Sequence, residues 1–160
     1  MTSTLSVPRP LRHNGAMEIT LPDLAATTAL AARIAAILRP GDAILLEGPL
    51  GAGKTEFARA LLRAATATPT LDVPSPTFTL VQRYDTPRGT VHHFDLWRLT
   101  GPDGLIELGW DDARDDIVLV EWPDRLGHLS PATALTIRLD PGPGESRTAH
   151  LTGWTDRLAR

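Results

Sequence analysis

AILLEGPLGAGKT, residues 43–55, is the stretch that decides the fold. A short, mostly apolar run is followed at once by Gly48–Thr55, which matches the Walker A pattern G-x-x-x-x-G-K-T. In this pattern the glycines permit a tight turn whose backbone N–H groups point at phosphates, while the lysine adds a mobile positive charge and the threonine hydroxyl binds Mg²⁺. An ordinary glycine-rich turn is the alternative. We favour a nucleotide site because Lys54, the only lysine, stands between a predicted buried strand and a predicted helix.

The phosphate loop therefore supplies the first group of predicted site residues, with Lys54 placed on the phosphates and Thr55 on the metal. The loop residues predicted to bind nucleotide are Gly48, Pro49, Leu50, Gly51, Ala52, Gly53, Lys54 and Thr55.

Hydrophobic spacing predicts the other elements around this loop. Helices are expected from Pro22 to Leu38 and over residues 54–67, with a last short helix over 154–160. Strands are expected over 17–21, 43–47, 77–84, 90–97, 117–122, 134–139 and 148–152, and residues 101–116 are expected to be a polar loop with one helical turn. The sequence thus predicts an α/β fold, a P-loop NTPase-like three-layer sandwich with a mainly parallel sheet and antiparallel hairpin additions. Residues 1–16 are expected to be a flexible leader, and residues 17–160 a single domain.

Two carboxylates follow apolar runs and are candidates for the acidic part of the site. Glu121 follows IVLV at 117–120, and Asp95 follows VHHF at 91–94. A phosphate loop needs an acidic residue at a strand end for Mg²⁺, and a group that positions the attacking water. A solvated residue at a strand end is the alternative for both, and it is the weaker one for Glu121, because an exposed glutamate rarely follows four apolar residues.

Other polar groups allow more than one interpretation. Ser75 and Thr77 lie where P-loop proteins often carry a switch-like loop, but from the residues alone an ordinary turn is equally compatible. His92 and His93 are adjacent on a predicted strand and must face opposite sides, so they indicate one core and one surface histidine rather than a metal pair. The aspartates at 111, 112, 115 and 116 are most simply a solvated loop.

Composition excludes several classes of protein. The 160 residues contain no Cys, which excludes disulfides, thiolate metal sites and cysteine nucleophiles. A formal net charge of −3 argues against a broad basic surface for nucleic acid. No apolar run approaches the roughly 20 residues that span a bilayer, and no signal peptide is evident, so a cytoplasmic protein without a membrane segment is expected.

Several segments together resemble the bacterial TsaE family, the ATPases of tRNA threonylcarbamoyladenosine biosynthesis. They are LEGPLGAGKTEFARAL at 46–61, VPSPTFTLVQRY at 73–84, HHFDLWRL at 92–99, IELGWDD at 106–112 and VLVEWPDR at 118–125. They occur in the family's order and cover residues 18 to about 150. The family usually has Tyr in place of Trp97, and more often Asp and Thr in place of Pro49 and Glu56.

The resemblance implies a Mg²⁺-dependent ATPase that supports multiple-turnover formation of N6-threonylcarbamoyladenosine next to the anticodon of tRNAs reading codons that begin with A. The transfer chemistry would belong to the partners TsaD and TsaB, and tRNA would be reached only through them. Residue by residue, the resemblance implies ATP on Gly48–Thr55, and Thr55 and Glu121 as Mg²⁺ ligands. It further implies Asp95 and Lys54 as catalytic residues, Ser75 and Thr77 as switch-loop contacts, and Trp122 beside the nucleotide.

Three other classes can be weighed on the sequence. A P-loop kinase for a small metabolite usually brings an arginine-rich lid, whereas these arginines are scattered. A signalling GTPase needs an Asn-Lys-x-Asp segment, which the chain cannot form because its only asparagine is Asn14. A partner protein that binds ATP without hydrolysing it remains open.

Overall fold

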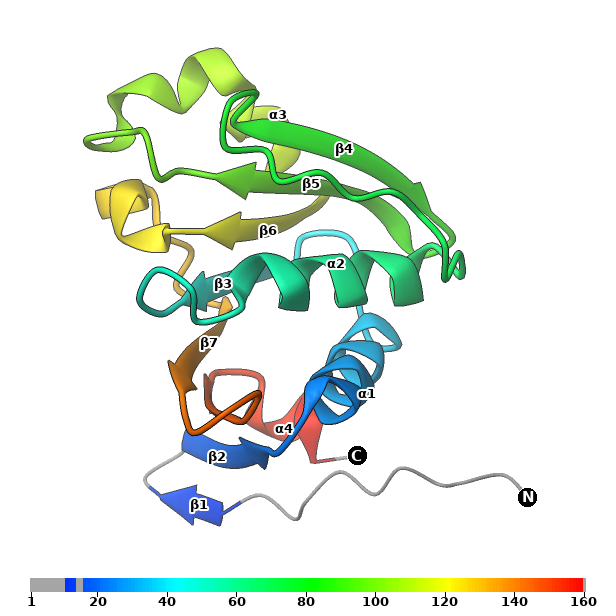
Figure 1. Ribbon diagram of the computed structural model, residues 1–160. Coiled ribbons are helices and arrows are strands. Elements are labelled where there is room, and N and C mark those ends of the chain that lie inside the picture. The colour runs from blue at the N-terminus through cyan, green and yellow to red at the C-terminus, as the bar shows by residue number, and fades with distance from the viewer. Residues whose placement is uncertain (1–10, 14–15, 160) are drawn as a thin grey trace.

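The computed structural model describes residues 11–13 and 16–159, which form one eight-stranded sheet with helices on both faces (Figure 1). The strand order is β1-β2-β8-β7-β3-β6-β5-β4. The strands are β1 (Leu11–His13), β2 (Ala16–Leu21), β3 (Ala43–Glu47), β4 (Val81–Thr86), β5 (Gly89–Asp95), β6 (Ile117–Glu121), β7 (Leu135–Pro141) and β8 (Arg147–Thr152). The helices are α1 (Leu24–Ala35), α2 (Lys54–Ala65), α3 (Trp110–Ala113) and α4 (Thr155–Leu158), with 3₁₀ turns η1 (Pro102–Gly104), η2 (Ile106–Leu108) and η3 (Pro123–Leu129).

The four central strands, β7, β3, β6 and β5, run parallel, and antiparallel strands extend the sheet on both sides. The hairpin β4–β5 forms one edge, and β8, β2 and β1 extend the other. Strands in the middle of a parallel sheet are covered on both faces, so they need continuous apolar runs. β3 and β6 meet this need, since their residues from Ala43 to Leu46 and from Ile117 to Val120 are buried.

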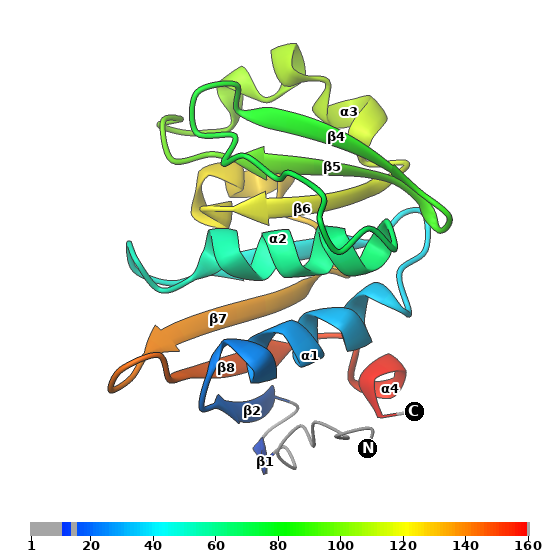
Figure 2. The ribbon, with the colours of Figure 1, turned by 45° about the vertical axis from the view of Figure 1, so that its right-hand side comes forward.

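Helices α1 and α2 cover one face of the sheet, as both views show (Figure 2). Their inner side chains, among them Ile34 and Phe57, join alternate strand residues such as Leu46 in one hydrophobic cluster. Asp23 caps α1, since its Oδ1 accepts a 2.9 Å hydrogen bond from the Ala26 N–H. The α1 helix therefore begins one residue after its cap, and the prediction of a start at Pro22 was slightly early.

The opposite face is covered by η1, η2, η3 and α3, which complete the third layer. Leu105 and Trp110 are buried there against Phe94, and the Phe94 and Trp110 rings meet edge to face at 5.3 Å between centroids. The segment 101–116 was expected to be a polar loop with one helical turn, and η2 is a turn in that segment. The segment forms a series of short helical turns, and a few of its large apolar side chains fill the hydrophobic cluster on this face of the sheet. The fold class predicted from the sequence is confirmed.

Some boundaries differ from the expectations. Residues 77–80, predicted to begin a strand, form a turn in which Leu80 has a left-handed φ of 67°, and β4 starts at Val81. The predicted leader 1–16 includes Leu11–His13, which instead pairs with β2 as β1. Ala16, also part of the predicted leader, is the first residue of β2. The other leader residues, 1–10 and 14–15, lie outside the described residues. No helix in the described part of the chain has the length and hydropathy needed to cross a membrane.

Candidate nucleotide site

The phosphate loop lies between β3 and α2 at the carboxyl edge of the parallel strands. Gly53 adopts a left-handed φ of 96° directly before α2, and no side chain caps the first turn of that helix. Free backbone N–H groups at a helix start are a ready anion site. Gly48 is fixed by a close approach, because a Cβ on it would stand 2.6 Å from the Leu139 carbonyl oxygen of β7. The loop thus has the open N–H groups that phosphate binding needs.

Lys54 folds back over the loop. Its Nζ donates hydrogen bonds to the carbonyl oxygens of Gly48 and Pro49, at 2.7 and 2.9 Å, and lies 4.0 Å from the centroid of the Trp122 ring. Burial lowers the pKa of Lys54 below its usual value, and the nearby carboxylates of Glu121 and Asp95 partly offset that effect. A cation held on weak carbonyl and ring partners in a buried position is well placed to turn to an anionic ligand.

Glu121 connects the loop to the sheet. It is 2% exposed, and its Oε1 accepts a 2.8 Å hydrogen bond from the Thr55 hydroxyl. Its Oε2 lies 2.7 Å from Nε2 of His93, which is fully buried. A hydroxyl and a carboxylate side by side are hard oxygen donors, the class that Mg²⁺ takes from proteins while it keeps water and phosphate oxygens as its other ligands. The residues therefore fit a magnesium ion.

Asp95 stands beside Glu121, because these two residues are register partners in the parallel pair β5–β6. Its carboxylate is 4% exposed and accepts hydrogen bonds from the Thr77 hydroxyl at 3.0 Å and from the Trp97 backbone N–H at 3.0 Å. The Ser75 and Thr77 hydroxyls are 2.8 Å apart, so the loop before β4 is tied to Asp95 through Thr77. The alternative of a solvated strand end is wrong for both carboxylates, since both are buried.

These side chains line one cavity of about 400 Å³. Most of the predicted residues lie on its wall: Leu50, Gly51, Gly53, Lys54, Thr55, Ser75, Thr77, Asp95, Glu121 and Trp122. Three others do not: Gly48 and Pro49 instead offer carbonyls to Lys54, and Ala52 is buried behind the loop. Within residues 11–13 and 16–159 there is no group of three or more acidic or histidine side chains that could hold a metal. A metal here would depend on Thr55, Glu121 and the ligand's own oxygens.

Four residues were not predicted as part of the site: Glu56, Trp97 and Arg147 line the cavity, and His93 contacts Glu121. The sequence did not show which of His92 and His93 is the core histidine. Trp97 and Glu56 were noted only as departures from the family's usual residues, and Arg147 was not singled out. The ring of Trp97 lies 4.4 Å from that of Trp122, centroid to centroid, at the mouth of the cavity. Period-two alternation places His93 on the same strand face as Asp95, but only the pairing of β5 with β6 shows that His93 meets Glu121.

The remaining polar groups lie outside the site. His92 faces away from His93, and its Nε2 lies 2.9 Å from Asp116 Oδ2. The prediction of a core histidine holds for His93, but His92 is largely covered, with a side chain that is 14% exposed, so the prediction of a surface histidine was wrong. Asp111 and Asp112 are exposed, but in the first turn of α3 rather than in a loop. Asp116 is only half-buried and pairs with His92.

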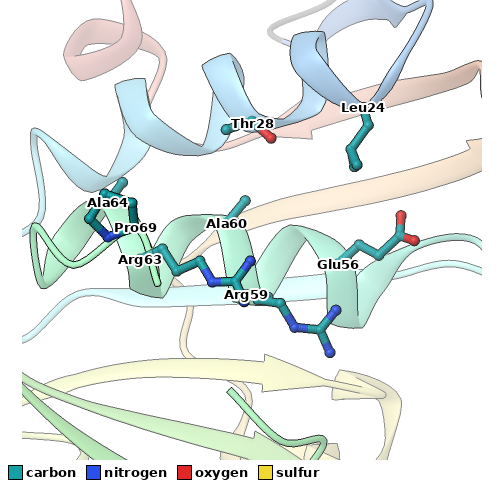
Figure 3. A pocket seen from close by; sticks show the side chains of 8 residues that line it. All are labelled: Leu24, Thr28, Glu56, Arg59, Ala60, Arg63, Ala64 and Pro69. Carbon is teal, nitrogen blue, oxygen red and sulfur yellow. The ribbon is translucent and has the colours of Figure 1, made fainter. Parts of the chain in front are cut away.

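A second hollow of about 410 Å³ lies between α1 and α2 (Figure 3). Leu24 and Thr28 of α1 face Ala60 of α2 across it. Each of its two arginines donates one hydrogen bond to the backbone, from Arg59 Nε to the Val73 carbonyl and from Arg63 Nε to the Leu71 carbonyl. Glu56 and Thr28 are the acid and the hydroxyl on its wall, and its lining includes no lysine and no glycine-rich loop. The cavity at the phosphate loop is therefore the stronger candidate for the nucleotide site.

The chain is similar to known proteins both in sequence and in fold. The family model described as threonylcarbamoyl adenosine biosynthesis protein TsaE matches residues 21–149. Proteins named tRNA threonylcarbamoyladenosine biosynthesis protein TsaE are similar: one from Rickettsia bellii is 36% identical over 79% of this chain and 88% of its own, and one from Nostoc is 35% identical over 84% and 85%. A crystal structure of Bacillus subtilis YdiB has the same fold, with a TM-score of 0.70 over 93% of both chains at 24% identity. On these matches the chain belongs to the TsaE family.

Proposed function

We propose that this protein is a Mg²⁺-dependent ATPase of tRNA threonylcarbamoyladenosine biosynthesis, acting in the cytoplasm. The observation that carries the proposal is the convergence of Lys54, Thr55, Asp95 and Glu121, from three places in the sequence, on one cavity beside the open N-terminus of α2. That set supplies the parts that P-loop hydrolysis needs: backbone donors, a cation, oxygen ligands for the metal and a buried carboxylate near the reacting phosphate.

Each side chain has a distinct role in the proposed reaction. Lys54 leaves the carbonyls of Gly48 and Pro49 and binds the β- and γ-phosphates of ATP. Thr55 and Glu121 hold Mg²⁺, which when bound neutralises charge that develops on the phosphate oxygens. Asp95 accepts a hydrogen bond from the water that attacks the γ-phosphate and orients it in line with the leaving oxygen. Ser75 and Thr77 close the loop over that water, and Trp122 packs beside the nucleotide.

We expect slow hydrolysis by the isolated protein because of the loop that carries Ser75 and Thr77. Ser75 is exposed, and within the described residues the one hydrogen bond of its side chain is to Thr77. Such a loop orders the attacking water poorly until a partner holds it in place. We propose the TsaD–TsaB pair as that partner, with tRNA engaged only through the complex. The absence of Cys and the net charge of −3 support a factor that leaves acyl transfer and tRNA binding to other proteins.

Two alternatives have different products. A P-loop kinase would transfer the γ-phosphate to a small acceptor and would give that phosphorylated product without any partner protein. A partner that only binds ATP would support tRNA modification without releasing phosphate. Phosphate release measured with and without TsaD–TsaB separates both from the proposed ATPase.

The experiment is a comparison of wild type with Lys54→Ala in the presence of TsaD, TsaB and tRNA. We expect the pair to raise the steady-state rate of ATP hydrolysis, and repeated rounds of tRNA modification to require that hydrolysis. The Lys54→Ala protein should neither hydrolyse ATP nor support repeated rounds of tRNA modification. Modification of many tRNAs per complex with the Lys54→Ala protein would overturn the coupling, and wild-type hydrolysis by that variant would overturn the site.

A further inference from the structure

Arg147, the first residue of β8, reaches the phosphate loop from 94 residues further along the chain than Gly53 (147 minus 53). It does so because β7 pairs with β3 in parallel, which lays the β7–β8 hairpin beside the loop. The contact is close: a Cβ on Gly53 would lie 1.5 Å from Nη1 of Arg147. Glycine is needed at position 53 for two reasons. It adopts the left-handed φ without strain, and its lack of a side chain leaves room for the guanidinium.

The guanidinium is only partly neutralised. Its Nη2 lies 3.1 Å from Oε2 of Glu56, whose side chain is 48% exposed. Its Nη1 is buried and has no hydrogen-bond partner within the described part of the chain. An unpaired buried donor on a charged group is costly, so its presence beside an anion site calls for an acceptor that a ligand supplies.

The place of Arg147 indicates which part of a nucleotide it would meet. Thr55, Glu121 and Asp95 mark the side where Mg²⁺ and the γ-phosphate belong. Arg147 lines the same cavity but stands against Gly53 and Glu56, at the first turn of α2. In P-loops the backbone N–H groups of the loop and of this helix start hold the α- and β-phosphates. The guanidinium therefore lies at the end of the site that ADP and ATP share.

We propose that Arg147 is a nucleotide-binding residue that moves from Glu56 onto the α- or β-phosphate and strengthens the binding of ADP and ATP alike. This inference rests on the proposed nucleotide site and adds a contact from the C-terminal hairpin to it. A planar guanidinium suits a phosphate because it offers parallel N–H donors to two oxygens.

The test is titration calorimetry of Mg·ADP and a non-hydrolysable Mg·ATP analogue with wild type, Arg147→Ala, Arg147→Lys, Glu56→Ala and Arg138→Ala. We expect Arg147→Ala to weaken the binding of both nucleotides by a similar factor, about 10- to 100-fold, as the loss of a hydrogen bond to a charged group does. Arg147→Lys should recover part of the loss. Arg138 lies on the same hairpin, is half exposed and pairs with Asp140, so Arg138→Ala should bind as the wild type does.

Glu56→Ala decides whether Arg147 acts directly. If Arg147 served only to hold Glu56, removing Glu56 would reproduce the loss, and that outcome would overturn the inference. We expect affinity that is unchanged or higher, because the competing carboxylate is gone. If circular dichroism shows that Arg147→Ala does not fold, the folded Arg147→Lys protein takes its place in the titration, and wild-type affinity in it counts against the proposal.

Three further outcomes are informative. If Arg147→Ala lost affinity for the ATP analogue but kept its affinity for ADP, Arg147 would contact the γ-phosphate. That result would overturn its assignment to the phosphates that ADP and ATP share. A wild-type protein that binds neither nucleotide would sink the proposed function itself. A wild-type protein that binds both, with Arg147→Ala equal to it, would sink this inference alone.

Discussion

The Thr55 hydroxyl donates a 2.8 Å hydrogen bond to Glu121, although 66 residues separate the two in sequence. Thr55 belongs to the start of α2 and Glu121 to the end of β6. They meet because β3, which leads into the phosphate loop, pairs in parallel with β6, so that both strands end at the same edge of the sheet. The bond links the start of α2, where we propose that phosphate binds, to the strand that carries the proposed metal ligand.

The first prediction separates the roles of the two buried carboxylates. Glu121→Ala removes a proposed Mg²⁺ ligand, so Mg²⁺-dependent nucleotide binding and turnover should both weaken. Asp95→Asn keeps the shape but loses the charge that orients water, so ATP should bind while turnover falls by about 10²- to 10⁴-fold. Calorimetry and single-turnover hydrolysis measure the two effects. The reverse pattern would exchange the roles, and equal small effects would remove both residues from the mechanism.

The second prediction concerns His93, whose buried Nε2 lies 2.7 Å from the Glu121 carboxylate. We expect His93 to donate this hydrogen bond and fix the side chain of a metal ligand, a contact whose loss typically costs about 10- to 100-fold in metal affinity or activity. His93→Leu should show that loss in the concentration of Mg²⁺ needed for half-maximal hydrolysis. His93→Gln places an amide N–H near the position of Nε2 and should recover most of it.

The paired variants separate positioning from packing. His93→Leu and His93→Gln both keep a side chain of moderate size in the core, so their thermal stabilities serve as the control. Similar melting temperatures with different Mg²⁺ dependence support a positioning role. Equal Mg²⁺ dependence in both variants and the wild type would show that His93 only fills the core.

The third prediction follows from the lowered pKa of Lys54. Burial disfavours the ammonium, so folding is opposed wherever Lys54 is charged in the unfolded chain. The opposition is complete below the lowered folded pKa and fades as the pH rises toward 10.5, the ordinary value, where the unfolded lysine also loses its proton. Lys54→Met carries no such cost and keeps a similar length.

We therefore expect Lys54→Met to be at least as stable as the wild type near neutral pH and to lose nucleotide binding. Its advantage in free energy of unfolding should shrink as the pH rises toward 10.5. Urea denaturation at several pH values measures the difference. A Lys54→Met protein less stable than the wild type at neutral pH would mean that the bonds to the Gly48 and Pro49 carbonyls outweigh the cost of burial.

Much of the fold follows from local patterns in the sequence. The apolar runs at 43–46 and 117–120 specify central parallel strands, because only strands covered on both faces are apolar throughout. The segment 101–116 was harder, since Leu105 and Trp110 are spaced for neither a regular helix nor a strand. Short 3₁₀ turns leave weak periodic signals, so their contribution to the core is visible only once the chain is folded.

The site shows the same division between local and long-range information. Lys54 and Thr55 belong to a local motif, and Asp95 and Glu121 lie at recognisable strand ends, so each could be predicted. Arg147 could not be predicted as a residue of the site, because nothing in the preceding residues 141–146 (PGPGES) indicates a contact with the phosphate loop. Its place beside Gly53 depends on the parallel pairing of β3 with β7, which is a long-range property of the sheet.

The last prediction tests where the proposed partner pair, TsaD–TsaB, would dock. Phe78 is 79% exposed, directly after Thr77, and the guanidinium of Arg98 lies 4.3 Å above its ring. Exposed aromatic side chains often anchor protein interfaces, and Thr77 links this loop to Asp95 by a 3.0 Å hydrogen bond. A partner that holds Phe78 would thereby order the groups around the attacking water. Phe78→Ser should leave the hydrolysis rate of the isolated protein unchanged and abolish most of its stimulation by TsaD–TsaB.

Ile106→Ser is the matched control, because Ile106 is also an exposed large apolar residue, 69% accessible, but belongs to η2 and not to the loop that carries Ser75 and Thr77. The measurement is steady-state hydrolysis at increasing concentrations of TsaD–TsaB, which gives a half-maximal concentration and a plateau for each variant. A raised half-maximal concentration for Phe78→Ser alone places the loop in the interface. Equal curves for Phe78→Ser and the wild type would exclude Phe78 from it, and equal defects in both variants would point to a general loss of solubility or folding.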